Sequence, residues 1–433
     1  MNELIERVEA EVDAGWDAEL AFLRDLVATP STLHHEAAAQ ARVMDELRGL
    51  GLEPEAQAID KEAIRALPGY SPVDWGYEAR PNVSAGWRGR GGGRSLVLNG
   101  HIDVVPVTPE RLWTHDPWGA EIVGGRTDGR LYGRGAADMK SGIAAMVYAV
   151  AAIRRAGIAL RGDVTIQSVI EEECTGNGTL AALEAARAAG GRDGAVADAA
   201  IIPEPFDQSV LAAQIGVLWA RVTVIGAGAH VLGADRAVNA IDKAAVLMEG
   251  IKAMEAAANA APRQSAFAGV PHPLNYNVGV VRGGDWPSSV PSECVLEVRF
   301  SAYPGADLEE AQRGFEAGVQ AVAARDPWLR EHPPGVEFYG FRAEGCEVDQ
   351  GAGVVDGLRR AHRRVMGTEA EPYVSTATTD VRFFSLYHGI PATCYGPVGG
   401  ALHAPDEWVD LRSVRNVTRV LALTALEWCG AAG

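Results

Sequence analysis

The stretch DVTIQSVIEEEC, residues 163–174, joins a strand-like run to three adjacent glutamates. Its first part is apolar and rich in β-branched residues, as in a strand that enters a core. Glu171, Glu172 and Glu173 follow without a break. Neighbouring carboxylates repel one another and are rarely buried without partners. Three of them at the end of a core strand therefore indicate either a nearby cation or a solvated loop.

The segments on either side of this stretch alternate between strand and helix. Apolar, β-branched runs predict strands, and apolar residues at helical spacing predict helices. Such alternation is typical of an α/β fold with a mostly parallel sheet. We expect strands at 95–103, 161–170 and 199–205, and helices at 3–27, 33–50, 138–157 and 179–190.

The pattern changes after about residue 213. A strand, a long helix, two strands and another helix follow one another within residues 214–335. That order predicts a small α/β sandwich inserted into the main domain. The α/β pattern resumes near residue 336, so we expect a discontinuous main domain of residues 1–213 and 336–433.

The composition argues against several classes of partner. The 433 residues carry a formal net charge of −18, whereas binding to nucleic acid or to anionic lipid requires a basic face. No stretch approaches the ~20 apolar residues of a membrane span, and the acidic, amphipathic N-terminal segment is unlike a signal peptide. The five cysteines have no C-x-x-C spacing, so we expect reduced thiols and a cytoplasmic protein.

Polar side chains gather where the predicted strands end. In an open α/β sheet, the loops at the carboxyl ends of the strands converge and carry functional groups. Asp138 and His403 lie in glycine-rich loops, GRGAADMKSG and GGALHAPDE. The side chains that follow the strands are His101, Asp103, Glu171, Glu172, Glu173 and Glu204.

These residue types favour a metal site. Imidazole and carboxylate together suit Zn²⁺, Co²⁺ or Mn²⁺. Two such ions share a bridging carboxylate, and together they activate a water and polarise a carbonyl group. Cations would also offset the repulsion within the glutamate run, and a glutamate that is not a ligand would be free to act as a base. The sequence therefore favours two divalent ions, with zinc preferred over cobalt or manganese; a mononuclear zinc site is the alternative.

Each feature has a simpler explanation when it is taken alone. The glutamate run fits a solvated surface, Asp138 fits a helix N-cap, and His403 fits a loop histidine that bonds to the backbone. Cys174, beside the glutamates, is either a nucleophile or a small buried residue. Only the whole ordered set is improbable by chance.

The ordered set resembles the successive motifs of the M20 family of metallopeptidases. The family includes acetylornithine deacetylase, succinyl-diaminopimelate desuccinylase, aminoacylase and glutamate carboxypeptidase. The resemblance implies an α/β/α catalytic domain that holds two metal ions, and an inserted ferredoxin-like domain that acts as a lid and pairs in a homodimer. The segments that carry the resemblance are NGHIDVVP, GRGAADMKSG, EEECTGNGT, PEP and GALHAPDE, which span residues 99–407.

The resemblance also implies a role for each motif residue. Glu172 would be the general base, and Asp103 would fix the ring of the ligand His101. The run allows a frame one residue earlier, so the assignment within 171–173 stays open. A cis peptide between Asp138 and the next residue is also implied. The implied ligands are His101 and Glu204 for one ion, Glu173 and His403 for the other, and Asp138 for both.

The substrate-side residues lie in and near the inserted domain. His230, in VIGAGAHV, resembles the family histidine that reaches the substrate carbonyl of the partner subunit; a strand-end histidine bonded to the backbone is the alternative. Asn277, in YNVGVVRGG, matches a second such position. Ser301 stands where the family often has an arginine, and Arg299 lies two residues earlier, so carboxylate binding by the lid is not implied. Arg382, in TATTDVRFF, is the substrate-binding arginine that the resemblance offers instead.

The implied reaction is hydrolysis of the amide bond of a small N-acylated amino acid or amine. A dipeptidase or carboxypeptidase would use the same motifs, and a metal-free binding protein on this fold is the alternative of another class. The acyl group leaves no signature in the sequence. Residues 55–87, with Trp75 and Tyr77, form a longer excursion than the family needs. We expect them either to wall the substrate pocket or to lie on the surface as a flap.

Overall fold

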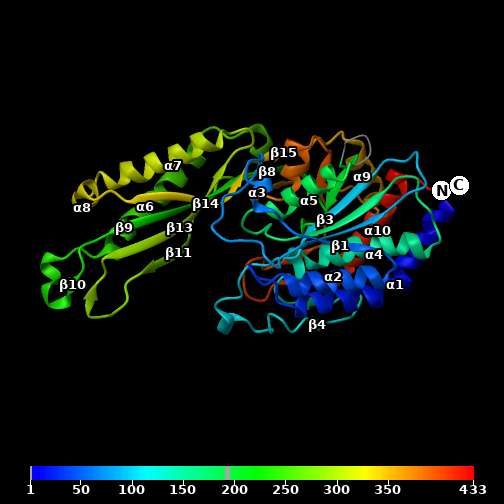
Figure 1. The fold of residues 1–433 in the computed structure, drawn as a ribbon, viewed down its shortest axis with the longest axis horizontal. Coiled ribbons are helices and arrows are strands. Elements are labelled where there is room, and N and C mark those ends of the chain that lie inside the picture. The colour runs from blue at the N-terminus through cyan, green and yellow to red at the C-terminus, as the bar shows by residue number, and fades with distance from the viewer. Residues whose placement is uncertain (1, 191–195) are drawn as a thin grey trace.

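The computed structural model describes residues 2–190 and 196–433. Figure 1 shows a larger unit, on the right, and a smaller elongated unit, on the left, which meet near β14 and β8. The larger unit contains both ends of the described chain, and the smaller unit is built from its middle.

A six-stranded sheet forms the centre of the larger unit. Strands β6, β3, β7 and β17 are parallel, whereas β2 runs antiparallel to both of its neighbours. All six residues of β3 are buried, as expected for an inner parallel strand with helices on both faces. In order across the sheet, the strands are β1 (Pro54–Gln57), β2 (Asn82–Trp87), β6 (Val164–Val169), β3 (Leu96–His101), β7 (Ala200–Ile202) and β17 (Ala392–Cys394).

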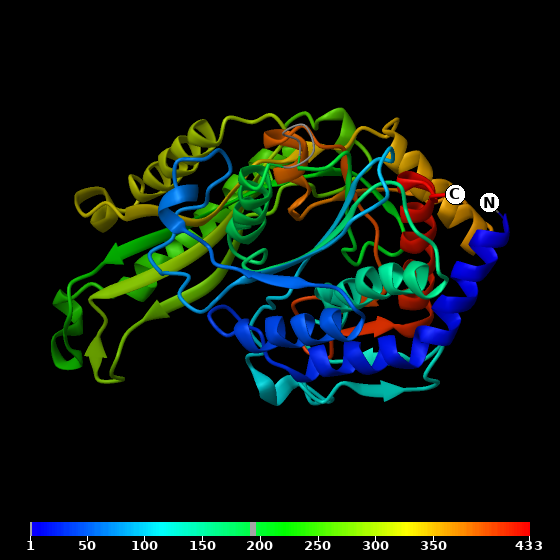
Figure 2. The same cartoon turned by 45° about the vertical axis from the view of Figure 1, so that its right-hand side comes forward.

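Helices cover both faces of this sheet (Figures 1 and 2). Helices α1, α4 and α10 pack against one another on one face, and α5 lies on the opposite face. Each presents an apolar stripe to the core, as α1 does with Val8, Val12 and Leu20. The helices are α1 (Asn2–Ala28), α2 (Ala37–Gly49), α3 (Lys61–Ile64), α4 (Ser141–Arg155), α5 (Asn177–Ala188), α9 (Gly353–Met366) and α10 (Leu411–Cys429).

Helix α4 is the most apolar of these helices. Among the described residues, the stretch Ala136–Arg155 that contains it is the one helix with the length and hydropathy of a membrane span. The structure buries 94% of that window. Its apolar character is thus that of a central core helix, which α1 and α10 cover.

Two small sheets bring distant segments of the larger unit together. Strand β8 (Val210–Gln214) lies between β15 (Cys346–Glu347) and β16 (Pro372–Ser375). In the other sheet, β5 pairs with β19, so the segment after β5 lies beside the turn that precedes β19. The strands of that sheet are β4 (Glu121–Val123), β5 (Arg130–Tyr132), β18 (Gly399–Gly400) and β19 (Trp408–Asp410).

The smaller unit is one antiparallel sheet with two helices on one face. Along β9, Leu218, Ala220, Val222 and Val224 alternate with more exposed residues and pack in the core of this unit. The chain order is a βαββαβ arrangement with the strand order β11-β13-β9-β14. Its elements are β9 (Gly216–Ile225), α6 (Ala240–Ala260), β11 (Asn277–Gly283), β13 (Glu293–Ala302), α7 (Leu308–Ala323) and β14 (Gly335–Ala343).

The smaller unit extends beyond the predicted boundary. Strand β14 pairs with β9 from Gly335 to Ala343, so the predicted return to the main domain at residue 336 is wrong. A strand at the edge of one sheet has the same local pattern as a strand of the next, and only its pairing assigns it. The short elements β10 (Ala229–His230), β12 (Ser289–Val290) and α8 (Pro327–Glu331) complete this unit.

The chain crosses between the two units at two adjacent points. Gly216 and Gly345 face each other there, and a Cβ atom on Gly216 would lie 2.8 Å from the backbone nitrogen of Gly345. A side chain at either position would therefore push the two crossings apart. Further contacts join the units: the backbone N–H of Gly340 donates to Pro72 O at 3.0 Å, and Arg299 Nη2 donates to Thr376 O at 2.8 Å.

Candidate metal centre

The predicted ligands converge at the carboxyl ends of the parallel strands. His101 is the last residue of β3, the glutamate run follows β6, and Glu204 follows β7. Asp138 lies in the turn between β5 and α4, and His403 lies in the turn between β18 and β19. The pairing of β5 with β19 brings these two turns to the same edge of the sheet.

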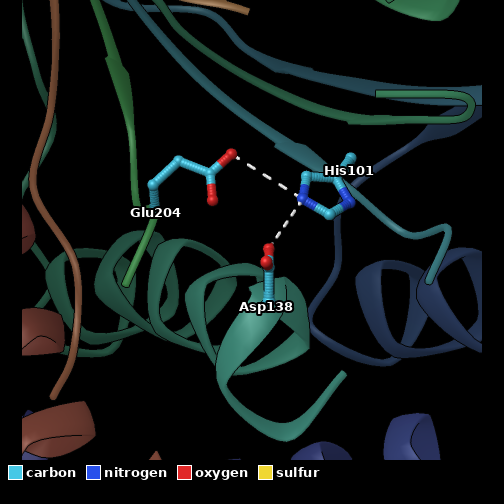
Figure 3. Close-up of side chains that lie close together, drawn as sticks. All are labelled: His101, Asp138 and Glu204. Carbon is cyan, nitrogen blue, oxygen red and sulfur yellow. Dashed lines mark hydrogen bonds and ion pairs between the residues drawn. The ribbon is translucent and has the colours of Figure 1, made fainter. Parts of the chain in front are cut away.

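A first group contains His101, Asp138 and Glu204 (Figure 3). The Nε2 atom of His101 lies 3.2 Å from Asp138 Oδ1 and 3.7 Å from Glu204 Oε1. In Figure 3 the two carboxylates point toward that nitrogen from different elements. One ligand atom of each residue lies within 4.8 Å of the others, which suits a single metal ion.

A second group contains Asp138, Glu173 and His403. The Nε2 atom of His403 lies 3.5 Å from Asp138 Oδ2 and 3.1 Å from Glu173 Oε2. Asp138 thus turns one oxygen to each group, which is the arrangement of a bridging carboxylate. The peptide bond between Asp138 and Met139 is cis, as the resemblance implied.

Glu172 lies beside the first group without belonging to it. Its Oε2 atom is 3.9 Å from His101 Nε2, and the side chain borders a cavity. Burial and the neighbouring carboxylates raise the pKa of Glu172 well above its ordinary range, although His101 opposes the shift. A carboxyl group with a raised pKa in this position is suited to accept a proton.

The carboxylates of the centre favour positive charge beside them. Burial and nearby carboxylates raise the pKa of Glu204, while Glu173 raises the pKa of His403 to about 11. Burial lowers the pKa of His101, but its hydrogen bond with Asp138 and the surrounding carboxylates raise it overall. The carboxylates thus favour protons on the imidazoles. Divalent cations would replace these protons, because metal ligands bind in their deprotonated forms.

Asp103 supports the centre differently from the prediction. The Nδ1 atom of His101 lies 3.0 Å from the backbone oxygen of Asp103, and 3.6 Å from its carboxylate. The carboxylate accepts the backbone N–H groups of Glu172 and Glu173, at 3.2 and 3.1 Å. Asp103 therefore fixes the histidine ring through its carbonyl, and the glutamate turn through its side chain.

Glu407 is a supporting residue to which the sequence assigned no role. Its buried carboxylate accepts the N–H groups of Gly135, Ala137 and Asp138, at 2.9 to 3.0 Å, and pairs with Arg134. It therefore holds the backbone that presents Asp138. Its position at the end of the motif GALHAPDE is the sequence feature that could have indicated a role for Glu407. Only the fold shows which N–H groups its carboxylate accepts.

A cavity of about 950 Å³ lies between the two units, beside the metal centre. Glu172, Glu173 and His403 line it from the larger unit, and Asn277 and Arg299 line it from the smaller unit. Asn277 thus borders the same cavity as Glu173 and His403. Among the described residues, no carboxylate oxygen lies within 4.0 Å of the guanidinium of Arg299, and burial lowers its pKa to about 10.

The chain matches the family model described as Peptidase family M20/M25/M40 over residues 97–427. It belongs to this family. The resemblance to the M20 family that the motifs predict is thereby confirmed.

Curated relatives in the M20 family share much of the chain. An N-formyl-4-amino-5-aminomethyl-2-methylpyrimidine deformylase of Halalkalibacterium halodurans is 29% identical over 98% of this chain and 98% of its own length. The Bacillus subtilis protein of the same name is 31% identical, over 83% of this chain and 86% of its own length. A succinyl-diaminopimelate desuccinylase of Leptothrix cholodnii is 30% identical over 91% of this chain and 94% of its own length.

Solved structures show the same fold at low identity. The dipeptidase Dug1p of Saccharomyces cerevisiae superposes with a TM-score of 0.79 at 14% identity, covering 99% of both chains. The YXEP protein of Bacillus subtilis, described as a dinuclear metal-binding peptidase of the M20 family, gives a TM-score of 0.58 at 15% identity, covering 96% of this chain and 99% of its own.

Arg382 and His230, two other residues predicted on the substrate side, do not line the cavity of their own chain. Arg382 is only 1% exposed, and its Nη2 atom donates to Thr175 O at 2.8 Å, so it braces the glutamate loop from inside instead of facing the cavity. His230 is exposed, and its Nδ1 atom accepts the backbone N–H of Leu232 at 3.2 Å. Strand β10, which contains it, lies at the far end of the smaller unit (Figure 1).

The excursion at 55–87 is neither a pocket wall nor a free flap. Trp75 and Tyr77 are absent from the described lining of the cavity, and both donate hydrogen bonds to Glu171. Cys174 is buried, and burial raises the pKa of its thiol well above the ordinary range. A neutral thiol is a poor nucleophile, so this cysteine fits the structural alternative.

Proposed function

We propose that this M20 protein is a dinuclear metal-dependent amidohydrolase that removes a small acyl group from an amine. The observation that carries the proposal is the position of Asp138 between two ligand groups, with Glu172 beside them at the cavity. Both groups have a complete set of ligand residues. This argues against a metal-free binding homologue, because mutations would have replaced some of these residues in a protein that no longer binds metal.

The donor set suits two divalent cations. Each group offers one histidine and one carboxylate of its own, together with an oxygen of the shared Asp138. Nitrogen and oxygen donors of this kind favour zinc, with cobalt or manganese as alternatives. When bound, the cations would supply Lewis-acid activation of a water molecule and of the substrate carbonyl.

Glu172 would move the protons of the reaction. Its carboxylate takes a proton from the attacking water, and the raised pKa allows it to hold that proton. It then delivers the proton to the leaving amine. Asp103 keeps the backbone of Glu172 in place, and Asn277 lies across the cavity, where it can donate a hydrogen bond to the substrate.

The curated relatives support a deacylase. Two of them are deformylases of an aminomethylpyrimidine, and another is a desuccinylase, so each removes a small acyl group from an amine. Their similarity covers most of this chain. We infer that a formyl or another short acyl group is the first substrate class to examine.

A dipeptidase or carboxypeptidase is the second candidate. It is favoured by Arg299, a largely buried cation that borders the cavity and donates to three neutral acceptors. A free peptide carboxylate would offer this guanidinium the ion pair that none of the described residues provides. The dipeptidase Dug1p, which shares the fold, is consistent with this alternative.

We further propose that the protein works as a homodimer through the smaller unit. Strand β11 is at the free edge of its sheet, and Val281 on that strand is 49% exposed. Leu232 and Trp286, at the tip beside His230, are 88% and 68% exposed. Exposed apolar side chains next to a free strand edge suit pairing of two identical copies. Such a pair would allow His230 to act at the partner's site.

Cytoplasmic location is part of the same proposal. All five cysteines are free and buried in the structure, as expected where thiols remain reduced.

The test is a substrate panel with metal-loaded protein. Wild-type enzyme, loaded with Zn²⁺ or Co²⁺, is assayed against N-formyl, N-acetyl and N-succinyl amines and against dipeptides, with Glu172→Gln as the inactive control. We expect the highest kcat/KM for an N-acyl amine. Preference for dipeptides would select the second candidate, and equal background rates for wild type and variant would exclude both.

A further inference from the structure

Glu171 is the member of the glutamate run that turns away from the metal centre. Its side chain is fully buried. The Oε1 atom accepts from Trp75 Nε1 at 2.7 Å and pairs with Arg80 Nη2 at 2.7 Å. The Oε2 atom accepts from Tyr77 Oη at 2.9 Å and from Thr175 Oγ1 at 3.0 Å. The carboxylate thus meets four donors, about as many as its lone pairs accept.

Three of these four donors come from one short segment before β2. We call Trp75, Tyr77 and Arg80 the 75–80 clamp. The segment is fixed by other contacts as well, since Lys61 Nζ donates to the carbonyl of Trp75 at 3.1 Å. Arg80 forms a fork with Glu36, with distances of 2.9 Å from Nε and 2.5 Å from Nη2. The clamp therefore presents three donors, held by further contacts, to one carboxylate.

The backbone of Glu171 has an uncommon conformation. Its φ of 64° lies in the left-handed region, which a residue with a side chain adopts only where its surroundings impose it. Its carbonyl accepts the N–H of Gly176 at 2.7 Å. The next two N–H groups, of Glu172 and Glu173, donate to the Asp103 carboxylate. The directions of the two following side chains thus depend on how Glu171 is held.

We propose that the 75–80 clamp is a positioning device for the reaction. By holding Glu171, it sets the directions in which Glu172 and Glu173 leave the end of β6. This inference rests on the proposed function, in which Glu172 is the base and Glu173 a metal ligand. Displacement of a catalytic group by about 1 Å can lower a rate by about 100-fold, so a fixed direction has a large effect on turnover.

Stability alone does not require this arrangement. Replacement of a buried ion pair by well-packed apolar residues is often neutral or stabilising. A fully satisfied polar network, in contrast, specifies one geometry. Glu171, with four directional partners, cannot rotate without breaking at least one hydrogen bond. The presence of Glu171 in the run is thus explained by the orientation of its two neighbours.

Conservative variants of the clamp test the proposal. Trp75→Phe and Tyr77→Phe each remove one donor and keep an aromatic ring. We expect kcat to fall about 10- to 100-fold and KM to change by less than about 3-fold, because substrate contacts are untouched. Glu78→Gln, an exposed change in the same segment, is the matched control and should keep the wild-type kcat. Wild-type kcat in both clamp variants would overturn the proposal.

A double-mutant cycle shows whether the clamp acts through Glu171. If it does, Glu171→Gln lowers kcat, and addition of Tyr77→Phe lowers it little further, since both changes break the same link. Losses that multiply in the double variant would mean that Tyr77 acts independently, and would contradict the proposal. Thermal unfolding of each variant separates a loss of kcat from a loss of folded protein.

A readout that does not need turnover separates this proposal from the proposed function. The variants are titrated with Co²⁺, and the visible absorption is recorded. We expect a changed spectrum or weaker binding of one Co²⁺ in Trp75→Phe and Tyr77→Phe, because Glu173 shifts, and no change in Glu78→Gln. A changed spectrum in a protein that cleaves no amide would reject only the proposed function. Unchanged spectra and kcat would reject only the clamp.

Discussion

At the scale of single residues, the three neighbouring glutamates have different surroundings. Glu171 is enclosed by hydrogen-bond donors, Glu172 borders the cavity 3.9 Å from the ring of His101, and Glu173 reaches the ring of His403 at 3.1 Å. These geometries support the predicted frame, with the base at position 172 and a ligand at position 173.

The roles proposed for Glu172 and Glu173 predict different effects of substitution. Glu172→Gln keeps the shape of the side chain and removes the base, so we expect unchanged metal content and kcat lower by about 10²–10⁴-fold. Glu173→Gln should instead weaken metal binding, measured by mass spectrometry after dialysis. If Glu173→Gln is the metal-replete inactive variant, the frame assigned here is wrong.

Substitution of Glu407 tests whether its carboxylate holds the loop that contains Asp138. Glu407→Gln replaces one acceptor oxygen with an NH₂ group, which would face a backbone N–H or Arg134. We expect the loop of Asp138 to shift and the metal affinity to fall by about 10- to 100-fold, as is typical for residues that hold metal ligands. Competition with a chelator measures the affinity. Glu121→Gln, an exposed carboxylate on β4, should leave it unchanged.

At the scale of helices and strands, local patterns predicted much of the fold. The apolar run that ends at His101 and the helical spacing of residues 3–27 appear as β3 and α1. The polar residues at the strand ends also come together as expected, because parallel strands direct their carboxyl ends to one edge. These inferences succeed where short-range periodicity determines which face is buried.

Long-range pairing accounts for what the sequence did not predict. The predicted domain boundary was residue 336, but β14 pairs with β9, so the smaller unit continues to Ala343. Arg382 was expected at the substrate, but the carbonyl of Thr175 and the ring of Phe383 hold it inside. Trp75 was expected at the surface or the pocket, and it meets Glu171 across 96 positions of sequence. No local pattern specifies such contacts.

The contact between α1 and α10 should make stability depend on pH. Glu19 of α1 is buried beside Thr418 of α10, and burial raises its pKa from 4.5 to about 8. Because the folded-state pKa is the higher one, its contribution is fully present below pH 4.5 and is lost as the pH rises through 8. The free energy of unfolding should fall across this window by at most about 1.4 kcal/mol per pH unit.

Glu19→Gln removes this titration. We expect denaturant unfolding of the variant at pH 5 and at pH 8 to differ less than for the wild type. Glu6→Gln, an exposed change on the same helix, should keep the wild-type dependence. An equal slope in Glu19→Gln and wild type would show that this carboxyl group does not titrate between the two states.

At the scale of the whole molecule, the distance of His230 from the metal centre sets a test of assembly. If His230 acts on the partner's site, a mixture of Asp138→Ala and His230→Ala subunits forms hybrids. One site of each hybrid carries both defects, and the other carries neither. Activity should therefore return in proportion to the hybrids that form. Subunit exchange is followed by native mass spectrometry, and exchange without recovery would place His230 outside catalysis or in its own site.

The facing glycines at the two crossings leave no room for a side chain at Gly216 or Gly345. A methyl group at Gly216 would lie 2.8 Å from Ala343 O, a backbone atom that cannot rotate away. Gly216→Ala should thus tilt the smaller unit away from the larger unit. The displacement should be greatest at β10, the end of the smaller unit that lies farthest from the crossings. Small-angle scattering of the variant should show a larger radius of gyration than that of wild type. The added methyl carbon at residue 216 would then change the size of substrate that the cavity admits, although every residue that lines the cavity stays the same.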